Sequence, residues 1–346
     1  MPRVAVIMPV RDDMKFLPEA LASLEAQTHQ DLTVLIVDNG SSDGLEAYLH
    51  GHFPRVAILR HTRDLGLVRA LNQGLAYAES RLQPESSNLF VLTMSPRLVL
   101  APTCVERLLA ALISVPTAGA AAAKILKAGV KGEGEFVEHV PTDLLDSVGL
   151  EIGRFGWPGR RQTGQVDKPE TGWHNEEGFG AVGELALYRF AALQTVRGHD
   201  GWFDESLGSA LTDADLAWRL RIRGWAALAV PAARAWRRSG AVVVSRWPRF
   251  QIWREWRRQP SRQRVLLRRN RWLLLAKNDH PLNFFRRLPV LAVRGLLGLV
   301  AVTLTEPDSL GYLPAAFSSL PRFLWRRREV FAQAVPAREL WRWFRN

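Results

Sequence analysis

The first third of the chain alternates short apolar runs with amphipathic segments, and this alternation restricts the possible folds more than any other feature. Buried strands are predicted at 3–10, 32–38, 55–61 and 88–94, and helices at 65–80 and 102–114. Runs rich in Val, Ile and Leu without polar alternation are typical of strands covered on both faces. Strands and helices in this rhythm predict an α/β fold, with a mostly parallel sheet and helices on both faces.

Ligands of such sheets bind beyond the carboxyl ends of the strands. The loops at 9–13, 38–44, 61–66 and 93–97 are therefore the candidate site. The sequence contains neither GxGxxG nor GxxxxGK[ST]. The dinucleotide and P-loop fingerprints are thus excluded as the source of the site's chemistry.

Four motifs follow one another along residues 3–240. They are "VDNGSSDG" (37–44), "DLGLVRALNQGL" (64–75), "VGELALYRFAAL" (182–193) and "FDE" with "DADL" (203–205 and 213–216). Together they resemble glycosyltransferase family 2, the inverting enzymes of GT-A fold, and most of all its rhamnosyltransferase-like subgroup. Taken alone, the first motif is better explained as an Asx-rich turn that closes a strand, and the motif that follows it favours the resemblance.

The resemblance implies a site for a nucleoside-diphosphate sugar. Asp38 would accept hydrogen bonds from the base or ribose, and Asn39 and Asp43 would shape the turn. The other positions implied to bind the donor are Pro9, Arg11, Asp12, Gly66, Asn72, Ser95, Arg97 and Arg237.

The resemblance also implies a general base, because Asp213 matches the family's catalytic Asp residue by residue. It would take the proton from an acceptor hydroxyl that attacks the sugar. Capping of the following helix is the alternative for both acids of "DADL", and it is favoured for Asp215.

The sequence departs from the family at three positions. The metal-binding carboxylate is replaced by Arg97, the late metal-binding His by Arg237, and the Glu before the base by Thr212. We therefore expect no metal cofactor, with the two guanidiniums binding the diphosphate instead. His174 and His199 remain as spare ligands, and a catalytically inactive relative that binds a glycan or a partner is the main alternative.

The chain's charge is uneven, since residues 232–346 carry 24 Arg and Lys against 6 Asp and Glu. We divide it into a GT-A domain at 1–240, with a loop-rich acceptor-side region at 127–180, and a basic, Trp-rich helical extension at 241–346. "RRNRWLLLAKN" (268–278) resembles a family helix that helps membrane docking. Leu288–Leu304 is a shorter apolar run than the ~20 residues that span a bilayer, so we expect it to lie on the membrane.

These features predict a cytoplasmic enzyme, peripheral on the inner face of the cell membrane, and the single Cys104 fits a reducing compartment. Its expected partners are a dTDP- or UDP-sugar donor, a cell-surface or lipid-linked glycan acceptor and an anionic membrane. The apolar tail could instead pack on the domain or form a homo-oligomer. Nucleic-acid binding is a rival explanation for the basic tail, but no nucleic-acid-binding motif accompanies it.

Overall fold

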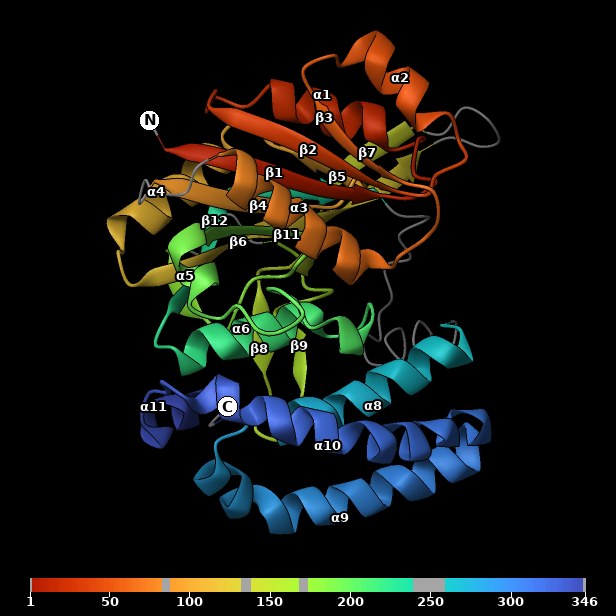
Figure 1. Cartoon of the computed structure of the whole chain (residues 1–346), viewed down its shortest axis with the longest axis vertical. Helices are drawn as coiled ribbons and strands as arrows, with labels where there is room; N and C mark the ends of the chain where they lie inside the picture. Colours follow the sequence, from red (N-terminus) through yellow and green to blue (C-terminus); the bar gives the residue numbers. More distant parts are fainter. Residues whose placement is uncertain (1, 83–87, 132–137, 168–173, 239–258, 345–346) are drawn as a thin grey trace.

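The computed structural model describes residues 2–82, 88–131, 138–167, 174–238 and 259–344 (Figure 1). The start of the Trp-rich tail and the predicted boundary near 240 lie outside these ranges. The strands are β1 (Arg3–Val10), β2 (Leu32–Asn39), β3 (Ala57–His61), β4 (Leu89–Met94), β5 (Leu98–Leu100), β6 (Ala118–Lys131), β7 (Glu138–Ser147), β8 (Leu150–Ile152), β9 (Pro158–Arg160), β10 (Glu176–Gly178), β11 (Leu185–Arg189) and β12 (Ala226–Arg237).

The main sheet has the order β10-β12-β6-β11-β4-β1-β2-β3, with β5 paired to β12 and β7 to β6. The pairs β1–β2, β1–β4, β2–β3 and β6–β12 are parallel, whereas β11 runs antiparallel to both of its neighbours. The predicted α/β architecture is confirmed. The carboxyl ends of β1 to β4 therefore open onto one edge of the sheet.

Helices cover both faces of this sheet because each has an apolar stripe. The helices of this part are α1 (Leu17–Glu25), α2 (Leu45–His52), α3 (Leu67–Arg81), α4 (Cys104–Ser114), α5 (Phe190–Gln194) and α6 (Thr212–Ile222). Residues of α1, α2 and α4 share one buried core with the strands, and residues of α3, α5 and α6 share the core on the other face.

The C-terminal helices form an additional layer below α6 (Figure 1). They are α8 (Ser261–Asn278), α9 (Pro281–Thr305), α10 (Tyr312–Phe331) and α11 (Ala337–Trp341), with 3-10 turns η1 (Glu205–Leu207), η2 (Pro307–Gly311) and η3 (Arg342–Phe344) along the chain. A third core joins Trp218 of α6 to Leu274 of α8 and Phe323 of α10, all buried. The helical layer thus packs directly on the α/β part of the molecule.

The prediction that 127–180 is loop-rich is wrong for most of the residues that the structure describes there. β6 continues to Lys131, β7 pairs with it antiparallel, and β8 and β9 form a small hairpin. Tight turns between these strands explain the glycine content, since Gly149, Gly156 and Gly164 all have positive φ. This region is therefore a scaffold that projects side chains toward the sheet edge.

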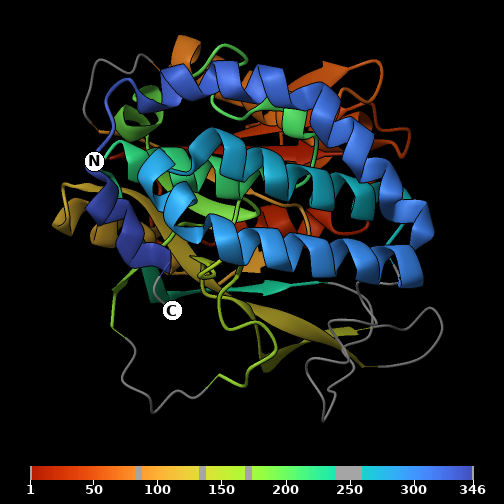
Figure 2. The ribbon, with the colours of Figure 1, turned by 90° about the horizontal axis from the view of Figure 1, so that it is seen from below.

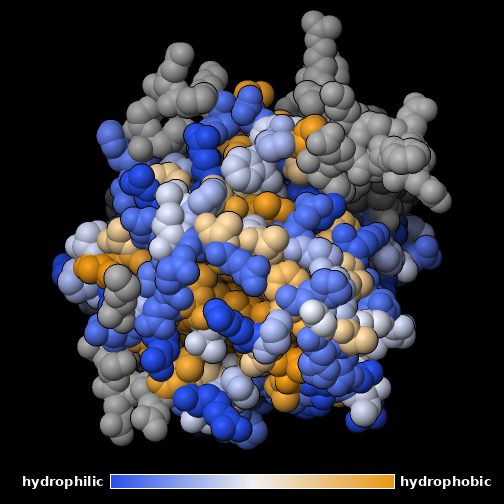
Figure 3. Space-filling model, turned by 90° about the horizontal axis from the view of Figure 1, so that it is seen from above, coloured by the Kyte–Doolittle hydropathy of each residue, from blue (hydrophilic) through white to orange (hydrophobic). Residues whose placement is uncertain are grey.

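The apolar helix is longer than the run at 288–304 predicts. α9 begins at Pro281, where the His280 side chain accepts a hydrogen bond from the Leu282 N–H, and it continues to Thr305. By length and composition α9 could cross a membrane, and only 11% of its most apolar window is buried. Seen from below, α9 and α10 lie on either side of α8 (Figure 2). At the opposite end, hydrophilic side chains cover most of the surface and apolar ones gather around a hollow (Figure 3).

Candidate active site

A cleft of about 480 Å³ opens at the carboxyl edge of the sheet. Its walls come from the ends of β1 and β4, the start of α3, the β8–β9 hairpin, the first turn of α6 and the beginning of α8. The polar residues that line it are Asp13, Ser95, Arg160, Glu184, Ser209, Thr212, Asp213, Gln259 and Gln263. The fold therefore places the cleft where parallel sheets bind ligands.

Asp213 lines this cleft from the first turn of α6. The Gly183 N–H donates to its Oδ2 at 3.2 Å, and the Ala214 N–H donates to its Oδ1 at 2.8 Å. A Cβ on Gly183 would lie 3.2 Å from the Cβ of Asp213, so the backbone approaches closely here. The carboxylate is thus held on the cleft wall, with both oxygens oriented by backbone amides.

Two arginines and two acids form a network at the same cleft, which Arg160 and Glu184 line together with Asp213. Arg160 donates to Asp146 at 2.6 Å and lies 3.1 Å from Glu184. Arg237 approaches the same two acids, at 3.0 Å from Asp146 and in close contact with Glu184. Burial lowers the pKa of Arg237 to about 10, to which repulsion from Arg160 contributes, so it remains a cation at neutral pH.

Arg97 adds a third cation to the same side of the cleft. It donates to Asp13 Oδ1 at 2.8 Å and its guanidinium lies 4.9 Å from the Phe16 ring centroid. The Arg238 N–H donates to the Arg97 carbonyl at 2.8 Å, which fixes the end of β12 beside β5. The fold thus brings together positions 97 and 237, and each guanidinium contacts an acid that lines the cleft.

The loops after β1 and β2 are tied to each other by side chains that the sequence predicts at the site. Asp12, at φ +48°, accepts a hydrogen bond from the Ser42 N–H at 2.9 Å, and Asp43 accepts one from the Met14 N–H at 2.9 Å. Asp38 is fully buried, accepts the Ser41 N–H at 2.8 Å and lies 3.5 Å from Arg60 Nε. In this geometry these acids order the turn.

A second set connects β2 to the loop before α3. Asn39 donates to Asp64 at 2.6 Å and accepts the Leu65 N–H at 2.9 Å, and Arg11 contacts the same Asp64. Gly66 caps α3 at φ +88°. Of the predicted donor-binding residues, Pro9 and Ser95 line the cleft, and the others are not among its lining residues.

Asn72 holds the loop that leads to Asp213. Its Nδ2 donates to the carbonyls of Asp200 and Phe203 at 3.0 and 2.9 Å, and its Oδ1 accepts the N–H groups of Trp202 and Phe203. Both ends of the buried amide are therefore used within the protein. Its predicted contact with the nucleotide remains a prediction, and this geometry favours a role in positioning the loop.

Within the part of the chain that the structure describes, the acids near the cleft are paired with arginines and are not grouped around a metal position. Across the described ranges, no group of three or more His, Cys, Asp and Glu is placed to hold one. Arg97 and Arg237 occupy the two positions where the family has metal ligands. The acids that these arginines contact are Asp13, Asp146 and Glu184. His174 is exposed, and His199 lies 3.1 Å from Asp200.

Comparison with known families agrees with this geometry. The model of glycosyl transferase family 2 matches residues 5–197, which is more than half of the chain. The chain belongs to glycosyl transferase family 2. The predicted family is confirmed. This family 2 glycosyltransferase is similar to the N-acetylglucosaminyl-diphospho-decaprenol L-rhamnosyltransferase of Mycobacterium tuberculosis strain H37Rv. The two are 27% identical over 228 residues, which cover 63% of the present chain and 70% of the relative.

A second relative is an uncharacterized glycosyltransferase of the same organism, 34% identical over 82 residues, which covers 23% of this chain and 31% of the relative. Two solved structures share the GT-A fold. Staphylococcus aureus TarS 1-349 in complex with UDP has a TM-score of 0.50 at 16% identity, over 96% of this chain and 88% of that one. GalNAc-T7 with UDP, GalNAc and Mn²⁺ also has a TM-score of 0.50 at 16% identity, over 71% of this chain and 45% of that one.

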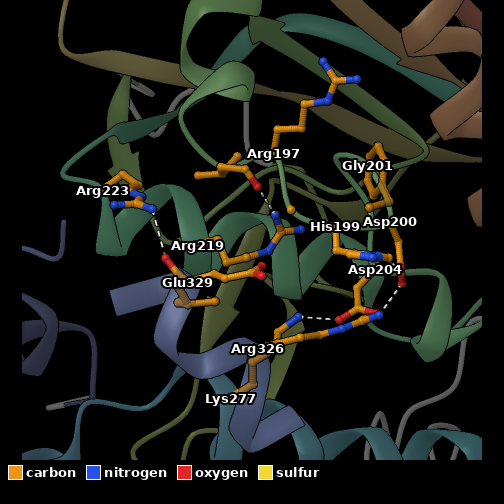
Figure 4. A pocket seen from close by; sticks show the side chains of 14 residues that line it. Arg197, His199, Asp200, Gly201, Asp204, Arg219, Arg223, Lys277, Arg326 and Glu329 are labelled. Carbon is orange, nitrogen blue, oxygen red and sulfur yellow. Dashed lines mark hydrogen bonds and ion pairs between the residues drawn. The ribbon is translucent and has the colours of Figure 1, made fainter. Parts of the chain in front are cut away.

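A buried charge cluster joins the motifs of this family 2 enzyme to its C-terminal helices (Figure 4). Lys277 Nζ lies 2.6 Å from both Asp204 Oδ2 and Asp215 Oδ1. Arg219 donates to the other oxygen of Asp215 at 2.9 Å, and Arg326 of α10 contacts Asp204. Burial opposes the charge of Asp204, but Lys277, Ser206 and Arg326 together hold the pKa of Asp204 below its ordinary value.

The interpretation of Asp215 as a helix cap is therefore wrong. α6 already begins at Thr212, its cap residue Leu211 makes no side-chain capping bond, and Asp215 is fully buried inside the first turn. Capping needs a carboxylate just before the first turn with access to the amides, whereas here it faces Lys277. The local pattern could not reveal this, because Lys277 comes from a distant helix.

The expectation that 268–278 docks on the membrane is also wrong for the polar residues of its motif. Asn270 donates to the carbonyls of Leu207 and Ala210, both at 2.7 Å, and Asn278 donates to Asp215 at 2.8 Å. Asn270, Lys277 and Asn278 are all buried. α8 therefore holds the segment that carries Asp213.

The sequence also missed Arg160 and Glu184 as parts of the cleft. Arg160 sits in the "PGRR" turn of a region interpreted as loop, and Glu184 lies in the motif "VGELAL" next to a strand. A signal was present for Glu184, since it directly precedes β11, the strand beside β4. For Arg160 only the β8–β9 hairpin brings the side chain to the site.

Proposed function

We propose that this enzyme transfers a sugar, with inversion, from a dTDP- or UDP-sugar to a hydroxyl of a cell-surface or lipid-linked glycan. One observation carries the proposal: Asp213 lines the cleft while three arginines gather around the acids of the same wall. A base and a cationic wall are what displacement of a nucleoside diphosphate requires.

In the proposed step, Asp213 accepts the proton of the acceptor hydroxyl. The acceptor oxygen forms a bond to the anomeric carbon as the bond from that carbon to the diphosphate oxygen breaks. The nucleoside diphosphate leaves with the bonding electrons, and the configuration at the carbon inverts. Gly183 orients the base through its N–H at 3.2 Å.

The reaction is tested by incubating the protein with UDP- and dTDP-sugars and a lipid-linked glycan acceptor, followed by NMR of the product. Inversion at the anomeric carbon is expected. Retention of configuration would contradict the role given to Asp213. Binding of donor without any turnover would favour the inactive relative instead.

In this proposal, Arg160 stabilises the negative charge of the leaving group, and Arg97 and Arg237 support Arg160. Their guanidiniums offer donors in a fork that matches phosphate oxygens. A bound diphosphate would compete with Asp13, Asp146 and Glu184 for these groups. We therefore propose that catalysis needs no metal.

Removal of metal gives the second prediction. The initial transfer rate should stay within about twofold of its starting value when EDTA is added, because the cations belong to the chain. Measurement in EDTA and after Mn²⁺ or Mg²⁺ addition checks this. Loss of activity in EDTA with recovery on Mn²⁺ would show that an ion is required. Arg160→Gln should lower the rate in both conditions, whereas the exposed Arg322→Gln should not.

The acceptor proposal rests on the relative whose name specifies a diphospho-decaprenol-linked N-acetylglucosamine. A polyprenyl-linked acceptor resides in a membrane. The described C-terminal part, 259–344, has 15 Arg and Lys against 5 Asp and Glu, and α9 exposes a row of apolar side chains. We therefore infer that the enzyme works at the cytoplasmic face of an anionic membrane.

Vesicle binding tests this location. Sedimentation with phosphatidylglycerol-containing vesicles should exceed that with neutral vesicles, and salt alone should release only part of the protein, because α9 buries apolar area. Val293→Glu and Leu297→Glu, both on the exposed face of α9, should weaken sedimentation. Full release by salt in wild type would reduce the contact to electrostatics. Duplex DNA binding with a steep salt dependence would support the nucleic-acid alternative.

A further inference from the structure

A second, larger groove lies on the far side of α8 from the catalytic half. It measures about 740 Å³, and α8, α9 and α10 supply its walls. Trp272, Leu275 and Ala276 form its floor, and the remaining lining is apolar apart from Arg327 and Tyr312. Seen from below, α9 and α10 flank α8 and leave it visible between them (Figure 2). The size lies in the range of pockets that hold one organic ligand, about 300–1,000 Å³.

The rim of this groove is unusual for a surface in contact with water. Phe285 and Leu296 of α9 are 66% and 64% exposed, and Phe317 of α10 is 71% exposed, although all three line the groove. Contiguous apolar surface of this kind marks a binding site for an apolar partner.

One helix connects the groove to the cleft. Gln263 and Leu267 of α8 line the cleft, and Trp272 and Ala276 line the groove. With a rise of about 1.5 Å per residue, Leu267 and Trp272 lie roughly 8 Å apart along the axis. These two positions are also about 140° apart around the helix axis, so a ligand that enters both sites must pass around the side of α8.

That linking stretch is cationic. Arg264 and Arg268 precede Trp272 and Ala276 on the same i, i+4 ridge of α8. Glu306 holds both of them, at 3.4 and 2.9 Å. Burial raises the pKa of Tyr312 on the groove wall, and the nearby charge of Arg268 opposes this rise. Positive charge thus stands between the sugar site and the apolar groove.

We propose that the groove binds the hydrocarbon chain of the lipid-linked acceptor, with Arg264 and Arg268 beside its phosphates and its sugar in the cleft. This inference rests on the proposed transferase function and specifies its acceptor as a long-chain lipid phosphate or diphosphate. The order of apolar groove, cations and catalytic cleft along α8 matches the order of chain, phosphate and sugar in such a lipid.

The test fills the groove without touching the cleft. Ala316 lines the groove, and Ala316→Trp places an indole inside it. Ala301→Trp adds the same group on an exposed position of α9 outside the groove lining. Binding of geranylgeranyl diphosphate is measured by calorimetry at concentrations where it is monomeric, with inorganic diphosphate as the probe for phosphate contacts alone.

Wild type and Ala301→Trp should bind geranylgeranyl diphosphate with the same affinity, and Ala316→Trp should weaken it about tenfold or more, since chain methylenes lose their burial. Inorganic diphosphate should bind all three equally and more weakly. Equal binding of the lipid by both variants would overturn the proposal. So would a dimer of the wild type that Ala316→Trp dissociates, because the groove would then hold a second copy.

Transfer assays separate this proposal from the proposed function. Ala316→Trp should raise KM for an acceptor with a long polyprenyl chain and leave KM unchanged for the same glycan on a short alkyl chain. If neither acceptor reacts with wild type, the transferase function fails. If both react with wild type and the variant changes neither, the groove proposal alone fails.

Discussion

Asp213→Asn should lower kcat for sugar transfer by about 10²–10⁴-fold, because a positioned base contributes that much. The amide keeps the size of the carboxylate and can still accept the Gly183 N–H, so the fold should persist. Donor affinity should change little, since the base faces the acceptor. Initial-rate kinetics with a donor-nucleotide thermal shift measure both quantities on the same preparation.

The matched control is Asp308→Asn, which removes an exposed carboxylate in η2, outside the cleft lining. It should leave kcat unchanged. A rate for Asp213→Asn equal to that of wild type would remove Asp213 as the base. The pH profile adds a check, because the acidic limb that reports the base should disappear in the variant.

Lys277→Met should destabilise the enzyme by about 3–5 kcal/mol, because it leaves Asp204 and Asp215 as buried acids without their shared ammonium. Asp204 is 6% and Asp215 0% exposed, and each would keep only its arginine contact, from Arg326 and Arg219, as an ionic partner. The midpoint of thermal unfolding should fall by roughly 10 °C. Differential scanning fluorimetry at neutral pH measures this shift.

The same variant should also lower kcat at a temperature where it remains folded. Lys277 connects α8 to the turn before α6, and that turn places Asp213 in the cleft. Arg322→Met, which removes an exposed cation of α10, serves as the control and should change neither property. A Lys277→Met protein with normal stability would show that the cluster adds nothing to the packing of α8. An unchanged kcat in a destabilised Lys277→Met variant would confine Lys277 to a structural role.

The sequence predicted those parts of the site that depend on local pattern. Apolar runs such as 3–10 and 88–94 fix buried strands because no other element buries both faces of so short a segment. The carboxyl ends of parallel strands then meet at one edge, which placed Pro9 and Ser95 beside the cleft before any coordinates. The position of Asp213 came from its motif.

Local pattern could not assign the partners of the charged residues. An Arg or Lys has the same periodicity whether it faces water, a membrane or a buried acid, so the sequence could not show that Lys277, in a motif predicted to dock on the membrane, faces two buried acids. Its actual environment is decided when α8 packs on α6, and that of Arg160 when the β8–β9 hairpin folds toward the sheet edge.

By itself, then, the order of residues determined the sheet, the family and the candidate base of this glycosyltransferase, since these follow from short-range spacing and burial. Only the tertiary structure decided which cations and acids lie at the cleft, and that α8 contributes both to the cleft and to an apolar groove. Those properties arise from contacts between segments far apart in the chain, and their energies depend on distance and exclusion of water.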